Sequence, residues 1–183
     1  MLPEPEKKTV DYYRRLSEKD LMTGLYNRGS FEYYVKKRLE SGEGGTFYMI
    51  DLDDFKAVND TYGHVAGDRV IMDMADILCR IFAKEAVIGR LGGDEFMIFM
   101  RDIYDQKIVL EKARKMLDMA ENYSIRDGLP DRLSLSIGIV IDDDIAKNFQ
   151  RLYHQADIAL YQAKQNGRGR YMVFEEGMMH PSD

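Results

Sequence analysis

The sequence contains little cysteine, no long apolar run and no excess of positive charge. Cys79 is the single cysteine among 183 residues, so no disulfide framework is possible and a reducing compartment is expected. No apolar run approaches the roughly 20 residues that cross a bilayer, and no signal peptide is visible. We therefore expect a cytoplasmic protein, or the cytoplasmic domain of a larger, membrane-anchored one.

The charge balance is acidic. The formal net charge of −6 at pH 7 argues against a broad nucleic-acid-binding surface. An anionic substrate would therefore need metal ions or a local cluster of cations. With 45% apolar residues and no internal repeat, the chain is expected to form one sizeable core. We predict one domain over residues 20–174, followed by a tail over 175–183. Residues 1–19 form either a charged linker helix or a disordered terminus.

Apolar spacing predicts a mixture of helices and strands. Short apolar runs and, at 132–140, alternation indicate strands, and recurrence every three to four residues indicates helices. Ser30 is the expected N-cap of the first helix, and Cys79 shares the apolar spacing of the second and is expected in the core. A hairpin combined with crossover helices implies an α+β fold, with a central sheet flanked by helices. The predicted strands lie at about 46–51, 86–89, 96–100, 132–140 and 170–174, and the predicted helices at about 30–41, 70–82, 105–121 and 149–166.

Acidic residues gather at two of the predicted strand ends. Asp94 and Glu95 follow Gly92 and Gly93 in the turn of the hairpin, and Asp51 ends the strand at 46–51. If these strands are neighbours, the carboxylates converge at one rim of the sheet, where hard oxygen ligands suit Mg²⁺. The alternatives are that the turn is a solvated hairpin tip and that Asp51 only forms a turn. Asp53 and Asp54 are expected to cap the next turn.

Longer motifs around these acids resemble the GGDEF family, the diguanylate cyclases. The resemblance covers about residues 20 to 174, and one mild departure is Met22, which stands near the place of the family's leucine. It implies a palm-like, ferredoxin-related sheet shared with nucleotide cyclases and polymerases. The four stretches that carry it are Asp20 to Arg28, Asp51 to Asp68, Gly92 to Phe96, and Ala156 to Arg168.

The resemblance also implies a set of metal and catalytic residues. Two Mg²⁺ ions, or Mn²⁺, would be held by Asp51, the backbone carbonyl of Leu52, and Asp94. Glu95 would serve in metal binding or proton transfer, and Lys56 would lie near the reacting phosphates. Two metal ions would polarise the α-phosphate and activate a hydroxyl.

Further positions are implied to bind the nucleotide. A carboxylate accepts from the N1–H and N2 amino groups of guanine together, and adenine offers no such pair. The implied positions are Asn59 and Asp68 for guanine, His64, with less weight, for another contact to the substrate, the backbone of Gly92 and Gly93, and Lys164 and Arg168 for the terminal phosphates. From the residues alone, Asp68 is interpreted as a helix N-terminal charge, and Lys164 and Arg168 as cations that complement a helix C-terminus.

The activity implied by the resemblance is the condensation of two GTP into cyclic di-GMP with release of two pyrophosphates. Each subunit would hold one GTP, so a homodimer would be needed, and an upstream sensory or receiver domain is expected. The alternatives are a silent GGDEF domain that binds GTP or cyclic di-GMP and regulates a partner, and an unrelated α+β binding module. Many family members carry an inhibitory product site with an arginine and an aspartate, and here the two positions are Ala83 and Ala86.

Overall fold

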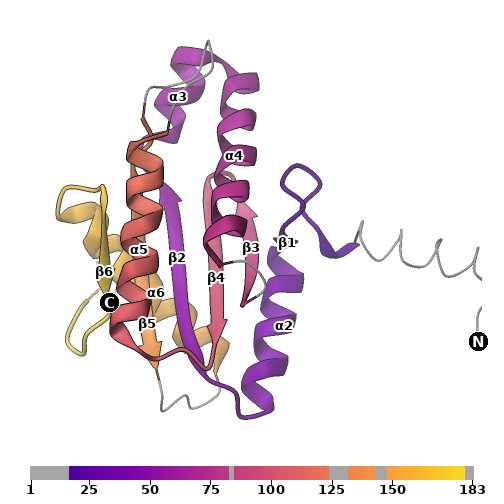
Figure 1. Ribbon diagram of the computed structural model, residues 1–183, viewed down its shortest axis with the longest axis vertical. Coiled ribbons are helices and arrows are strands. Elements are labelled where there is room, and N and C mark those ends of the chain that lie inside the picture. Colours follow the sequence, from indigo (N-terminus) through magenta and orange to yellow (C-terminus); the bar gives the residue numbers. More distant parts are fainter. Residues whose placement is uncertain (1–16, 83–84, 124–131, 143–147, 180–183) are drawn as a thin grey trace, which may run out of the picture.

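One mixed sheet organises the molecule, shown in Figure 1 from a computed structural model that describes residues 17–82, 85–123, 132–142 and 148–179. The strand order is β1-β3-β4-β2-β5-β6. The inner pairs β3–β4, β4–β2 and β2–β5 are antiparallel, whereas the edge pairs β1–β3 and β5–β6 are parallel. The strands are β1 (Tyr26–Asn27), β2 (Gly45–Leu52), β3 (Ala86–Gly92), β4 (Glu95–Arg101), β5 (Leu135–Asp142) and β6 (Arg170–Val173).

Strand β2 is buried along its whole length because both faces of the sheet are covered. Tyr48 and Ile50 pack in the cluster beneath α4 (His64–Phe82) and α5 (Gln106–Glu121). Phe47 and Met49 point the other way, into the cluster beneath α2 (Arg28–Glu40) and α6 (Phe149–Gln165). This alternation is the period-two pattern of a strand with two buried faces.

A short helix lies at the upper end of the sheet in Figure 1, beyond the C-terminal end of β2. This helix, α3 (Phe55–Tyr62), packs against the next helix, α4. Its side chains are half-buried or exposed, so it belongs to the rim of the sheet and not to the core. The C-terminal end of β2 therefore opens onto a rim formed by α3, the start of α4 and the β3–β4 turn.

The predicted α+β fold is confirmed, and most predicted elements are observed within one or two residues. Two elements were not predicted, the short helix α3 and the two-residue strand β1, because neither carries a full apolar stripe. Strand β5 starts at Leu135 and not at 132, although Leu133 still packs in the same cluster. The predicted linker helix at 4–19 lies mostly outside the described residues. No helix within the described ranges is long and apolar enough to span a bilayer.

Several local expectations were wrong. Helix α2 begins at Arg28, and its N-cap is Asn27, whose side chain accepts from the Ser30 amide at 3.0 Å. Cys79 is exposed, because neighbours such as Leu78 already fill the buried face of α4 and the next residue turns about 100° away from it.

The expectation that Asp53 and Asp54 cap the next turn was also wrong. Asp54 precedes α3 in a left-handed conformation (φ 53°), and within the described residues its side chain makes no capping hydrogen bond. A helix N-cap normally has extended backbone angles, which aim its side chain at the helix amides. The carboxylate of Asp53 bonds instead to β5 and to the turn after α6.

Candidate active site

The register of two antiparallel strands brings the acidic motifs together. Asp51 of β2 lies opposite Glu95, the first residue of β4. The Leu52 amide donates to the Asp94 carbonyl at 3.3 Å, which ties the end of β2 to the hairpin turn. The predicted convergence of these carboxylates at one rim of the sheet is therefore observed.

The hairpin turn depends on its two glycines. Gly92 has φ 148° and Gly93 has φ 53°, both in the positive range that disfavours side chains. Open space surrounds both positions, so the glycines are required by the backbone conformation and not by crowding. The strand pairing shifts register between Arg90 and Gly92, and this irregularity turns Asp94 toward the end of β2.

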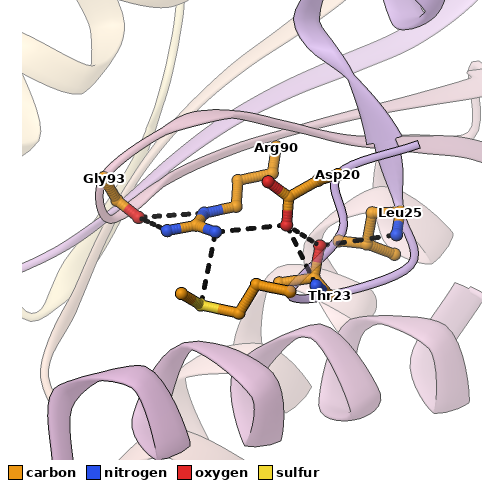
Figure 2. Close-up of polar contacts among 6 residues, drawn as sticks. Asp20, Thr23, Leu25, Arg90 and Gly93 are labelled. Atoms are coloured by element: carbon orange, nitrogen blue, oxygen red, sulfur yellow. Dashed lines mark hydrogen bonds and ion pairs between the residues drawn. The ribbon is translucent and has the colours of Figure 1, made fainter. Parts of the chain in front are cut away.

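Arg90 holds this turn to the N-terminal motif, as Figure 2 shows. Its guanidinium donates through Nε (3.0 Å) and Nη2 (2.7 Å) to the Gly93 carbonyl. Its Nη1 forms an ion pair with Asp20 at 3.1 Å. Asp20 is itself held by Thr23, whose amide and hydroxyl donate to the same carboxylate oxygen at 2.9 and 2.7 Å. Arg90 therefore clamps the turn that carries Asp94.

Sequence reasoning missed this clamp. Asp20 begins one of the four motif stretches, and Arg90 lies outside all of them. Burial of Asp20 acts to raise its pKa, but the hydrogen bonds from Thr23 and the pairing with Arg90 outweigh burial, so the pKa is lowered. The one available signal was an acidic motif residue that needed a cationic partner elsewhere in the chain.

Asp51 is the most buried acid of the converging group, with 9% of its surface exposed. Burial raises its pKa, the charges of Asp94 and Asp53 add to the rise, and Lys164 opposes it. The Lys164 ammonium reaches the Asp51 carboxylate at 2.8 Å from the last turn of α6. A cation predicted for the phosphates is thus paired with a predicted metal ligand.

Glu95 shares this environment, although its side chain reaches solvent. Partial burial raises its pKa, and the negative charges of Asp51, Asp94 and Asp157 raise it further, while Lys164 opposes the rise. A raised pKa makes a carboxylate a better proton acceptor near neutral pH. The converging group therefore combines several carboxylates with one ammonium at the rim of the sheet.

The residues predicted to bind guanine lie at the junction of α3 and α4. Asn59 of α3 packs so closely on Gly67 of α4 that a Cβ at Gly67 would overlap its side-chain oxygen. Asp68 follows Gly67 directly, so the close helix approach brings Asn59 and Asp68 to the same junction. His64, the first residue of α4, is exposed beside them.

The comparisons identify the family. The sequence profile described as "Diguanylate cyclase, GGDEF domain" matches residues 17–170. The chain belongs to the GGDEF family. It is similar to the probable diguanylate cyclase DgcE of Escherichia coli, at 35% identity over 160 residues, which are 85% of this chain and 14% of that protein. The structure resembles the solved GGDEF domain of TpbB (YfiN) from Pseudomonas aeruginosa, at 32% identity and a TM-score of 0.78, covering 86% of this chain and 94% of that one.

One similar protein carries a different name. The cyclic di-GMP phosphodiesterase PdeR of Escherichia coli is 31% identical over 183 residues, which are 94% of this chain and 26% of that protein. The chain thus spans only a part of the two curated relatives, and each relative contains much sequence with no counterpart here. The fold prediction is confirmed as the palm-like sheet of GGDEF structures.

Lys56 and Arg168, two further predicted residues of this GGDEF domain, are both exposed. Lys56 is exposed in the first turn of α3. Arg168 follows α6 in a left-handed conformation with φ 58°, and its side chain is exposed. Among the described residues, no three His, Cys, Asp or Glu side chains converge in a metal-holding arrangement, and Lys164 takes the Asp51 carboxylate.

A cavity lies beside this site and not in it. It has a volume of about 560 Å³ and lies between α3, the end of α5 and the residues that lead into β5. Val58, Leu117 and Leu133 line its wall, whereas Asp51, Asp94 and Lys164 do not. This cavity therefore does not hold the converging acids, although Leu52 and Asp53 also line it.

Proposed function

We propose that this GGDEF domain is a diguanylate cyclase that converts two GTP into cyclic di-GMP and two pyrophosphates. The observation that carries the proposal is the β2–β4 register, which sets Asp51 opposite Glu95 and bonds Leu52 to Asp94. Polar residues from motifs more than 40 positions apart meet at one rim, which a set of unrelated surface acids would not do.

The reaction would proceed by two equivalent phosphoryl transfers. The 3′-hydroxyl oxygen of one GTP forms a bond to the α-phosphorus of the other, and the bond from that phosphorus to the bridging oxygen of the β-phosphate breaks. Pyrophosphate leaves with the electron pair, and the hydroxyl proton passes to a base. Glu95 suits the role of base because burial and its acidic neighbours raise its pKa.

The acidic group fits a divalent cation. Mg²⁺ prefers carboxylate and carbonyl oxygens, and Asp51, Asp94 and the Leu52 carbonyl would hold it, with Mn²⁺ as a substitute. When bound, two such ions would polarise the α-phosphate and favour ionisation of the attacking hydroxyl. The raised pKa of Asp51 supports this fit, because burial and, to a lesser degree, the neighbouring carboxylates disfavour its negative charge, which a bound cation would compensate.

Loading of the site would require Lys164 to exchange partners. Its ammonium now neutralises Asp51 at 2.8 Å, and a bound cation would take over that role. Lys164 would then be released to the terminal phosphates, together with Arg168 from the following turn and Lys56 from α3. Asn59 and Asp68 would bind the guanine at the α3–α4 junction, with His64 beside them.

The proposed reaction needs two copies of the chain. One rim supplies the groups for a single GTP, so the two substrates would meet only when two rims face each other in a homodimer. Such dimerisation would be governed by an upstream sensory or receiver domain in a longer cytoplasmic or membrane-anchored protein. The output would be cyclic di-GMP signalling.

A silent regulatory domain is the second candidate function. The observation that favours it is the similarity to PdeR, a protein named for hydrolysis of cyclic di-GMP and not for its synthesis. In that case the rim would bind GTP or cyclic di-GMP without turnover. The intact Asp51, Asp94 and Lys56 weigh against this candidate, because a binding domain has no need of a full catalytic set.

Turnover by the isolated chain tests the proposal. Purified protein is incubated with GTP and Mg²⁺, and cyclic di-GMP and pyrophosphate are measured over a range of protein concentrations and in a fusion to a coiled-coil dimer. We expect a rate per subunit that rises with concentration and is highest in the fusion. GTP binding without product in the fusion would favour the silent domain, and absence of both binding and product would refute both candidates.

A further inference from the structure

Asp53 is a buried acid that the proposed chemistry leaves without a role. It follows β2 directly and is only 9% exposed. Its spacing from Asp51 resembles a pair of metal ligands, yet its oxygens already accept three hydrogen bonds. Oδ1 accepts from the Ser136 hydroxyl at 2.7 Å, and Oδ2 accepts from the Ser134 hydroxyl at 2.6 Å and from the Gly169 amide at 3.0 Å.

These bonds join two distant segments of the chain. Ser134 and Ser136 lie at the start of β5, where the Asp53 amide also donates to the Ser134 carbonyl at 2.9 Å. Gly169 lies in the turn between α6 and β6, 116 positions from Asp53. A buried carboxylate is costly unless its oxygens are satisfied, so this junction is held firmly once it is formed.

The turn that Asp53 holds also carries Arg168. Arg168 has φ 58° and Gly169 has φ 60°, so a non-glycine residue occupies a left-handed conformation there. Such a conformation costs about 1 kcal/mol or more and persists only where the surroundings hold it. The bond from the Gly169 amide to Asp53 is one such restraint, and the bond from the Arg168 amide to the Ala163 carbonyl at 3.1 Å is another.

We propose that Asp53 is a positioning residue that holds the α6–β6 turn so that Arg168 faces the phosphates of a nucleotide bound beside Asp51. This inference rests on the proposed function, because it assigns the site a triphosphate. Asp53 acts through the turn and does not touch the ligand. Asp51, two positions earlier, would bind the cation, whereas Asp53 would position the turn that carries Arg168.

The test compares two neighbouring acids. Asp53→Asn keeps the shape of the side chain but replaces one acceptor oxygen with a donor group, and Asp54→Asn is the matched control at an exposed position that tolerates asparagine in a left-handed conformation. Binding of 3′-deoxy-GTP, which lacks the attacking hydroxyl, and of GMP is measured by calorimetry with Mg²⁺. We expect Asp53→Asn to weaken 3′-deoxy-GTP roughly tenfold or more, the scale of one charged hydrogen bond, and to change GMP by less than about twofold.

Three further results separate positioning from a general structural effect. In an Arg168→Ala background, Asp53→Asn should cause no additional loss of 3′-deoxy-GTP affinity. Equal weakening of GMP and 3′-deoxy-GTP, or a loss that adds fully to that of Arg168→Ala, would overturn the proposal. Equal affinities for Asp53→Asn and Asp54→Asn would overturn it as well.

Amide exchange provides a readout that needs no nucleotide. In the free protein, deuterium uptake at the Gly169 amide should be faster by about tenfold in Asp53→Asn than in Asp54→Asn, because its acceptor is lost. If the wild-type chain binds neither nucleotide, the proposed function fails, and unchanged exchange at Gly169 refutes the positioning role separately. If Asp53→Asn does not fold, Ser134→Ala removes one of its donors and should weaken 3′-deoxy-GTP selectively, and an unaltered affinity would count against the proposal.

Discussion

The clamp between Arg90 and the hairpin turn gives a sharp prediction. Arg90→Lys retains the positive charge but replaces a planar fork with a single ammonium, which cannot hold the Gly93 carbonyl and the Asp20 carboxylate in the same geometry. We expect the turn to loosen and Asp94 to leave its place beside the end of β2. The fold should persist, because the clamp lies at the rim and not in the core.

The magnitude follows from the contacts. The Arg90 side chain is 11% exposed and Asp20 is 27% exposed, so solvent screens this pair less than a surface pair. Loss of two bonds to a carbonyl and one ion pair should lower the free energy of unfolding by about 3 kcal/mol in Arg90→Ala and about 1–2 kcal/mol in Arg90→Lys. The catalytic effect should be larger, because a misplacement of about 1 Å at reacting groups costs up to roughly 100-fold in rate.

The stabilisation that the clamp provides should also depend on pH. The folded-state pKa of Asp20 is lowered, so its stabilising contribution is complete above the unfolded pKa of about 4 and is lost as the pH falls through the lower folded value. The stability difference between wild type and Arg90→Ala should therefore be constant near neutral pH and shrink under acidic conditions. Urea unfolding at a series of pH values measures it.

Arg101 supplies the control. Arg101 is the last residue of β4, and Arg90 likewise lies near the end of its strand, β3. The Arg101 side chain is 52% exposed, however, and its ion pairs to Glu43 and Asp102 are long, at 3.7 and 3.5 Å. Arg101→Ala should cost about 0.5 kcal/mol or less. Cyclic di-GMP formation and calorimetric GTP binding are measured for both positions, with binding little changed because guanine would lie at the α3–α4 junction. Wild-type turnover by Arg90→Lys, or an equal loss in Arg101→Ala, would refute the reasoning.

The remaining predictions concern the metal, the base and the product. Asp51→Ala and Asp94→Ala should each abolish cyclic di-GMP formation while the far-ultraviolet circular dichroism stays unchanged, and near-normal product from either would remove it from the metal site. Asp68→Ala should weaken GTP binding by about 1–3 kcal/mol without altering the Mg²⁺ dependence, and an unchanged preference for guanine over adenine would remove it from the base site. Because Ala83 and Ala86 stand at the positions of the family's product site, added cyclic di-GMP should inhibit only in competition with GTP. Tight non-competitive inhibition, mapped by substitution to that surface, would contradict this; Ala83 lies outside the described residues.

Elements with strong apolar patterns were predictable from the sequence. Continuous apolar runs marked β2 and β4, and the observed pairing of the two strands then places Asp51 beside the hairpin acids. Helices α5 and α6 follow equally directly, since each buries a full apolar stripe, whereas α4 was predicted only from residue 70 and begins at His64. Helix α3 was missed because it is short and only Phe55 and Val58 pack against the core, so its apolar side is too small to stand out in the sequence.

The contacts that support the site were not predictable. Asp53 bonds to Gly169 over 116 positions, and Arg90 pairs with Asp20 over 70. No local pattern encodes such a pair, because many acids and bases in the chain would satisfy the same chemistry. The pairing of Lys164 with Asp51 belongs to the same class, since spacing along α6 predicts the helix face and not the partner.

The apolar residues of β2 determine on which side of the sheet its acidic residue lies. Phe47 and Met49 pack toward α2 and α6, which places Asp51 on the same side, where Lys164 reaches it from α6. A slip of one residue in β2 would reverse every side chain, so Asp51 would face α4 and lose both Lys164 and the partner position of Glu95. The alternation that forms the core therefore also selects which carboxylates meet. A substitution that alters the register of β2 would dismantle the site without changing any polar residue.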